Sequence, residues 1–134
     1  GVVVFDYNND GWDDIYQTGA TTNYTSGILY RNNANGTFTN VSIATNVRQG
    51  DTNPLCASAT DFDHDGWADL LIVSSGLGGG KALLLLKNNG NGTFSKRNDL
   101  LPFTAFSGIT YAHAWVDYDA DGWEDALIPF NNTI

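Results

Sequence analysis

The sequence is poor in the residues that mark several common classes of protein. It has one cysteine, Cys56, and no methionine among 134 residues. A single cysteine excludes a disulfide within the chain, and a lone thiol in apolar surroundings is usually a small buried side chain rather than a nucleophile. No apolar run reaches the ~18 residues of a membrane span. The longest candidate, residues 82–86, has the length of a β-strand.

Basic residues are also scarce. The chain has 6 basic and 15 acidic residues and a formal net charge of -9. A nucleic-acid-binding surface needs basic side chains to neutralise phosphates, so we expect no nucleic acid among the partners. The acidic residues are strongly clustered, because eleven of the 15 are aspartates at the same few positions of three short, related segments.

These segments share the pattern Asp-x-Asp-x-Asp-Gly-x-x-Asp. Residues 61–69 and 117–125 follow it fully, and residues 6–14 follow it with Asn8 at the third position. Their first aspartates are 55 and then 56 residues apart. A constant period of this length predicts an array of one supersecondary unit.

The repeat extends beyond the aspartate segments, since residues 28–38 match residues 84–94 at a shift of 56. β-Branched and aromatic residues dominate around these segments, Asn-Gly marks hairpin turns, and no window has a helical period with caps. We expect first strands at 2–5, 57–60 and 112–116, second strands at 15–18, 70–74 and 126–129, third strands at 28–31 and 83–87, fourth strands starting at Phe38 and Phe94, and linkers at 42–55 and 95–108.

The predicted fold is therefore all-β. Four short antiparallel strands in a repeat of about 55–56 residues make up a β-propeller blade, and Ala57, Ala59, Ala112 and Ala114 suit crowded innermost strands. The repeats are approximately 1–55, 56–110 and a partial 111–134. Propellers have about four or more blades. We therefore expect an incomplete propeller segment, either part of a longer protein or completed by neighbouring chains that cover its open edges.

The aspartate segments have the chemistry of calcium loops. Ca²⁺ takes six to eight oxygen ligands, and side chains at positions 1, 3, 5 and 9 with a main-chain carbonyl at 7 supply them. Glycine at position 6 permits the positive φ of a sharp turn. The predicted ligands, one Ca²⁺ per loop and up to three in total, are Asp6, Asn8, Asp10, Trp12 and Asp14; Asp61, Asp63, Asp65, Trp67 and Asp69; and Asp117, Asp119, Asp121, Trp123 and Asp125.

A metal-free turn, a magnesium site and a zinc site are less favoured interpretations of these loops. Without a cation, each carboxylate pair at ~4 Å repels by about 1–4 kcal/mol, so an Asx-rich turn alone is a poor structural device. Mg²⁺ prefers fewer protein ligands, and zinc prefers the Cys or His ligands that these positions lack. Asn8 removes one charge, so we expect weaker binding in the first loop. We expect the tryptophan rings to pack between blades.

The aspartate pattern, together with the Leu-Tyr-Arg-Asn-Asn-x-x-Gly-Thr-Phe-type segment at 29–38, resembles the FG-GAP/VCBS repeat family. This family includes integrin α-subunit propellers and cartilage-acidic-protein and ASPIC/UnbV-type proteins. The resemblance covers nearly the whole chain and implies that 1–134 is part of one extracellular, seven- or eight-bladed propeller domain with calcium between the first two strands of each blade. The name-giving tripeptides are degraded to Gly19-Ala20-Thr21 and Phe106-Ser107-Gly108, which places the chain nearer the bacterial and secreted VCBS branch than the integrins.

The remaining signals concern glycosylation and catalysis. Asn-x-Ser/Thr sequons occur at Asn23, Asn35, Asn40, Asn91 and Asn131. His64 and His113 have no Cys or Ser partner at a hydrolase spacing, and the loop aspartates recur where a catalytic pair would be unique, so we predict no enzyme. We expect an extracellular, secreted or cell-surface segment that binds other proteins or glycans in adhesion. The alternative is a repeat subunit of an extracellular, N-glycosylated filament or matrix completed by neighbouring chains.

Overall fold

The computed structural model describes residues 1–19, 27–48, 54–74, 82–101 and 112–129, and its architecture is all-β. The first sheet contains β1 (Val2–Phe5), β2 (Asp14–Gln17), β3 (Ile28–Asn32) and β4 (Phe38–Asn40). The second contains β5 (Pro54–Thr60), β6 (Asp69–Ser74), β7 (Ala82–Asn88) and β8 (Phe94–Lys96). A third, two-stranded sheet contains β9 (Ala114–Val116) and β10 (Asp125–Leu127), and η1 (Asn98–Leu100) is a short 3-10 helix.

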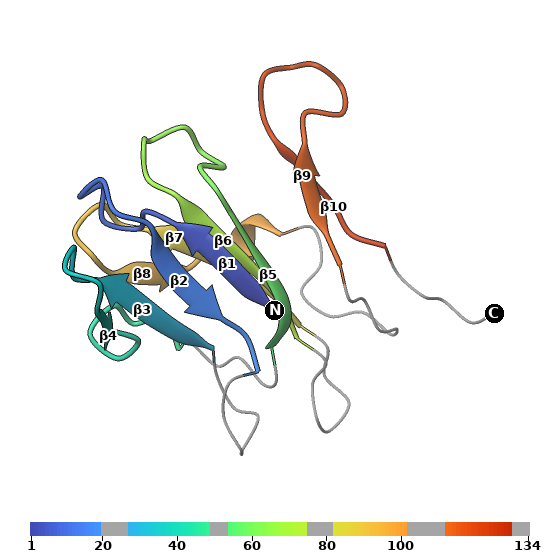
Figure 1. The fold of residues 1–134 in the computed structure, drawn as a ribbon. Coiled ribbons are helices and arrows are strands. Elements are labelled where there is room, and N and C mark those ends of the chain that lie inside the picture. The colour runs from blue at the N-terminus through green and yellow to red at the C-terminus, as the bar shows by residue number, and fades with distance from the viewer. Residues whose placement is uncertain (20–26, 49–53, 75–81, 102–111, 130–134) are drawn as a thin grey trace.

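Each sheet is an antiparallel meander whose strands follow chain order. The first two sheets run β1-β2-β3-β4 and β5-β6-β7-β8, and β9 pairs with β10. The three sheets stand side by side, with β1 next to β5 (Figure 1). This arrangement agrees with the predicted incomplete propeller segment, in which the first strands of neighbouring blades lie next to one another. Ala57 and Ala59 on β5 are half-buried and pack against the core shared with the first sheet, whereas Ala112 and Ala114 are exposed, so the predicted crowding holds for the first pair alone.

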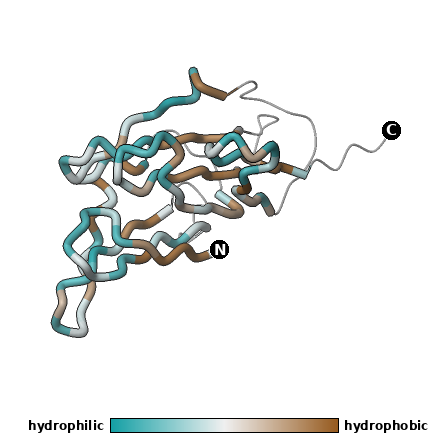
Figure 2. The backbone as a smooth tube through the Cα atoms, turned by 90° about the horizontal axis from the view of Figure 1, so that it is seen from above, coloured by the Kyte–Doolittle hydropathy of each residue, from teal (hydrophilic) through white to brown (hydrophobic). Residues whose placement is uncertain are grey.

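The middle sheet is buried on both faces, because side chains of a strand alternate between the two faces. Leu70, Ile72, Leu84 and Leu86 join the core shared with the first sheet. Their neighbours Leu71, Val73, Leu83 and Leu85 form a second cluster, against which Trp115 and Ile128 pack. Hydrophobic stretches accordingly follow the strands, while hydrophilic residues gather in the loops (Figure 2).

The predicted strands are confirmed in number and order, with shifts at their ends. β1 coincides with the predicted 2–5, and β4 and β8 start at Phe38 and Phe94 as expected. β5 begins at Pro54, inside the predicted linker 42–55, and pairs with β6 across a register shift between Pro54 and Cys56. β9 begins at Ala114 rather than residue 112. These differences arise at ends, where a strand continues only as far as its partner supplies hydrogen bonds.

Candidate metal-binding loops

The three aspartate loops each connect the first strand of a sheet to the second, as predicted. They lie between β1 and β2, between β5 and β6, and between β9 and β10. The glycine at position 6 has a positive φ in every loop, 85° at Gly11, 89° at Gly66 and 91° at Gly122. Position 4 is also left-handed, with φ of 55–59° at Asn9, His64 and Ala120. Two consecutive tight bends therefore fold each loop back on itself within nine residues.

A common set of hydrogen bonds holds each loop in this shape. The carboxylate at position 1 accepts the backbone N–H groups of positions 5 and 6, and the carboxylate at position 5 accepts the N–H of position 7. The distances are 3.2, 2.7 and 3.0 Å in the first loop, 3.0, 2.8 and 3.0 Å in the second, and 3.1, 3.1 and 2.8 Å in the third. These hydrogen bonds to the backbone fix the orientation of the acidic side chains.

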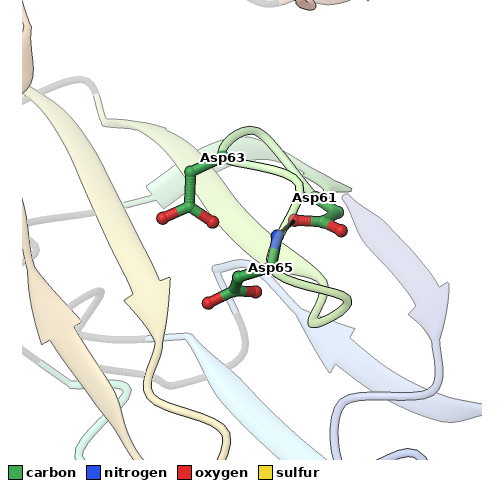
Figure 3. Close-up of side chains that lie close together, drawn as sticks. All are labelled: Asp61, Asp63 and Asp65. Carbon is green, nitrogen blue, oxygen red and sulfur yellow. Dashed lines mark hydrogen bonds between the residues drawn. The ribbon is translucent and has the colours of Figure 1, made fainter.

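In the second loop, three carboxylates face a common space. Oxygens of Asp61, Asp63 and Asp65 lie within 4.8 Å of one another and could hold a metal ion (Figure 3). The Oδ1 atom of Asp63 is buried and has no hydrogen-bond partner. Leaving such an oxygen unsatisfied costs about 1–3 kcal/mol. The Asp63 Oδ1 is therefore suited to be a ligand of a cation. Hard carboxylate oxygens are the ligands that Ca²⁺ prefers.

The third and first loops differ in detail. Oxygens of Asp117, Asp119 and Asp125 also lie within 4.8 Å of one another and could hold a metal ion. In the first loop, the Nδ2 of Asn8 donates to Asp10 at 2.9 Å, and the Asn8 Oδ1 accepts the Asp10 N–H at 3.2 Å. The amide therefore takes the place of one carboxylate without a like-charge repulsion.

The aspartate at position 9 accepts a backbone N–H in every loop, and in the first two loops it accepts a second one from the third strand. Asp69 is 1% exposed, and its oxygens accept the N–H of Phe62 at 3.2 Å and of Asn88 at 2.7 Å. Asp14 makes the same two bonds, with Tyr7 at 3.1 Å and Asn32 at 2.7 Å. These carboxylates fasten the loop to the third strand. Burial raises the pKa of Asp69 to about 6, and it also raises the pKa of Asp14.

The tryptophans at position 7 have three different surroundings. Trp123 stacks on His64 of the second loop, with ring centroids 4.5 Å apart and an angle of 8° between planes, so it does pack across repeats. Trp67 lies against Gly90 in the turn of its own repeat, where an added Cβ would be 2.9 Å from the Trp67 Nε1. Trp12 is 50% exposed. Packing across repeats, as predicted, is therefore seen for Trp123, whereas the contact described for Trp67 is with the turn of its own repeat.

Neighbouring loops contact one another in series. The Nδ2 of Asn9 in the first loop donates to the carbonyl of Gly66 in the second at 2.9 Å. His64 of the second loop then stacks on Trp123 of the third. Both bridging residues occupy position 4, so the left-handed residue of one loop reaches position 6 or 7 of the next.

A second polar cluster joins the first strands β5 and β9 of the second and third sheets. The Nε2 of His113 lies within hydrogen-bond distance of the Ser58 Oγ, and its Nδ1 is 3.4 Å from the Cys56 Sγ. The indole of Trp115 donates to the Ser58 Oγ at 2.8 Å. The sequence predicts no partner for His113 at a hydrolase spacing, and Ser58 lies 55 residues away from it. That separation is itself the repeat period, which is the signal that identifies them as neighbours.

The electrostatics of this cluster favour neutral groups. Burial raises the pKa of the Cys56 thiol and lowers the pKa of His113. A thiol is a nucleophile or a metal ligand as the thiolate, so a raised pKa points to a packing role for Cys56. The cluster fastens the third sheet to the second.

The predicted glycosylation sites lie partly within the described residues. Asn35, Asn40 and Asn91 are exposed. Asn35 and Asn91 lie in the turns between the third and fourth strands, where each side-chain oxygen accepts the N–H of the sequon threonine at 3.1 Å. Asn23 and Asn131 lie outside the described residues.

The meandering sheets and their repeated loops define a β-propeller-like repeat domain. A family model described as "FG-GAP-like repeat" matches residues 6–72 and 61–128, and each match begins at the first aspartate of a loop. The chain belongs to this FG-GAP-like repeat family. A comparison with curated proteins finds none that matches it. In the part of the chain that the structure describes, no helix has the length and hydrophobicity needed to span a membrane.

Proposed function

We propose that the chain is a calcium-binding segment of an extracellular β-propeller, without enzymatic activity, that serves adhesion to proteins or glycans. The observation that carries the calcium assignment is the second loop, where three carboxylates converge and the Asp63 Oδ1 is buried without a partner. A divalent cation there would remove the repulsion among the carboxylates and supply that oxygen with a contact. Asp61, Asp63 and Asp65 would hold it.

Calcium titration of the full chain, followed by thermal melting, tests this proposal. We expect Ca²⁺ to raise the melting temperature and the chelator EDTA to reverse the increase, because an ion that binds only the folded state stabilises it by mass action. Asp61→Asn removes one charge from the second loop and should weaken the binding there. Asp13→Asn is the matched control, since Asp13 is exposed and lies outside the ligand positions. A melting temperature insensitive to Ca²⁺ and EDTA would contradict the proposal.

The extracellular location is part of the same proposal, and the family and the chemistry of the loops support it. Loops of low affinity fill with Ca²⁺ where the ion is abundant, which is outside the cell, where modules bind it with dissociation constants of about 10⁻⁴–10⁻³ M. The exposed sequons at Asn35 and Asn91 fit the same compartment. Fractionation of the source cells, with the chain detected in the medium or at the surface, tests the location.

A second candidate function is a subunit of an extracellular filament or matrix that neighbouring chains complete. The observation in its favour is that apolar side chains are exposed on both outer sheets. Val2 and Val4 on β1 are 64% and 59% exposed, and Leu127 on β10 is 64% exposed. Analytical ultracentrifugation distinguishes the candidates, because concentration-dependent association that Val4→Lys abolishes supports assembly, whereas a monomer at all concentrations contradicts it.

A further inference from the structure

The second loop differs from the first in a basic residue that reaches it from another strand. Lys87 lies on β7, and its Nζ pairs with the carboxylates of Asp63 and Asp65, the latter at 2.6 Å. Both aspartates belong to the group whose oxygens could hold a metal ion. The ammonium is therefore bonded to two of the three carboxylates that a cation would need.

The first repeat offers a natural comparison. Arg31 occupies the position of Lys87, because residues 28–38 match 84–94 at a shift of 56. The Arg31 Nη2 donates to the Asn33 Oδ1 at 3.5 Å, and among the described residues no ion pair joins Arg31 to a loop carboxylate. The first loop also has Asn8 where the second has Asp63. The loop with the extra carboxylate is thus the loop with the paired lysine.

We propose that Lys87 is an internal competitor for the metal ion of the second loop. It neutralises Asp63 and Asp65 while the loop is empty, and it is displaced when a cation binds. The inference rests on the calcium binding proposed above and adds its regulation. The Asp63 Oδ1 stays without a partner although Oδ2 is paired, so Lys87 satisfies the loop only in part. A divalent cation that contacts both oxygens of Asp63 is attracted more strongly to the carboxylates than the singly charged ammonium is.

The surroundings of Lys87 allow this exchange. Its side chain is 20% exposed, and its Nζ lies 5.9 Å from the centre of the Phe62 ring. A lysine has a flexible four-carbon stem and a strongly hydrated ammonium, so the head can move to solvent while the stem still covers the ring. Competition by Lys87 lowers the affinity of the second loop, whereas Asn8 lowers that of the first. The two loops consequently differ less in affinity than their carboxylates alone predict.

Calcium titration of the ¹⁵N-labelled full chain by NMR measures the loops separately. The amides of Gly11, Gly66 and Gly122 each donate to the first aspartate of their own loop and report on it. Lys87→Met should lower the Ca²⁺ midpoint of Gly66 about tenfold, because two partly exposed ion pairs no longer compete. The midpoints of Gly11 and Gly122 should not change.

Two further variants isolate the charge of Lys87. Arg31→Met is the matched control and should leave all three midpoints unchanged. Lys87→Gln should lower the Ca²⁺ midpoint of Gly66 as Lys87→Met does. A methionine thioether is a poor calcium ligand, so agreement between the two variants excludes a new ligand as the cause of tighter binding. Without metal, Lys87→Met should lower the melting temperature by about 3 °C, and saturating Ca²⁺ should remove the difference.

The outcomes separate this inference from the function on which it rests. If Gly66 titrates at the same Ca²⁺ concentration, or a higher one, in Lys87→Met than in the wild type, Lys87 does not compete and the calcium function stands. If no glycine amide responds to Ca²⁺ in either protein, the calcium function itself is wrong, and the competition falls with it.

Discussion

His113 shows how a single side chain connects two repeats. It lies between Ser58 and Cys56 of the neighbouring strand β5, and Trp115 donates to the same serine. Because all of these partners are uncharged, the imidazole is accommodated in its neutral form. A half-buried, neutral histidine makes the attachment of the third sheet to the second sensitive to protons.

The pH dependence of unfolding tests this role. Burial lowers the pKa of His113 below its usual 6.5, so the unfolded chain binds the proton more readily than the folded chain. Its contribution to the free energy of unfolding should be complete above about pH 6.5 and decrease as the pH falls through the folded-state pKa. His113→Gln should remove this dependence, measured as the difference from wild type in urea titrations at several pH values.

The free energy of unfolding must be compared between His113→Gln and the wild type, because Asp69 changes it with pH in the opposite direction. Burial raises the pKa of Asp69 from 3.8 to about 6, so in the metal-free chain its ionisation costs stability as the pH rises through this range. His113→Gln leaves that contribution in place. If the variant and the wild type lose stability in parallel below pH 6.5, the histidine is not responsible.

Residues in local motifs could be predicted, whereas their long-range partners could not. The left-handed glycine at position 6 follows from the loop sequence alone, since only nearby residues decide that turn. Lys87 on β7 reaches Asp63 in the loop between β5 and β6 because β7 pairs with β6. The sequence does not indicate in which direction the Lys87 side chain extends. The Asn9–Gly66 and His113–Ser58 contacts required the repeat period and the lateral order of the sheets.

At the scale of an element, the turns between the third and fourth strands differ between repeats. Gly90 has a φ of 70° and lies against Trp67, whereas Ala34 has the same backbone conformation with a φ of 60° beside the half-exposed Trp12. The glycine leaves room for the indole, and the alanine occupies the corresponding volume. We infer that this one methyl group in the turn accounts for the greater exposure of Trp12.

Exchanging these two residues tests the explanation. Gly90→Ala should destabilise the chain by about 1–2 kcal/mol through its left-handed backbone, with a further cost for displacing the indole. The tryptophan emission should shift to the red as Trp67 becomes more exposed. Ala34→Gly is the matched control and should stabilise by less than about 1 kcal/mol, since it only relieves backbone strain. Unchanged emission in Gly90→Ala would show that the turn does not position the ring.

The whole molecule is a row of sheets whose burial is unequal. The strand β6 is buried at all six of its residues, whereas all three residues of β10 are exposed. Among the residues that the structure describes around the third sheet, Trp115 and Ile128 are the two that pack on the apolar cluster of the second. The free energy of local opening depends on the apolar contacts that the opening breaks. The third sheet should therefore open without the second, and the second should open only when the whole fold unfolds.

Hydrogen exchange followed by mass spectrometry measures this order. Amides of β6 and β7 should exchange most slowly, at the rate set by global unfolding, those of β2 and β3 at intermediate rates, and those of β9 and β10 fastest. Trp115→Ala should accelerate exchange in β9 and β10 and leave β2 and β3 unchanged, because its ring lies against the cluster between the second and third sheets. Equal protection of β10 and β6 would mean that the row unfolds as one unit, and that the contacts between loops, from Asn9 to Trp123, couple the sheets more strongly than their apolar faces do.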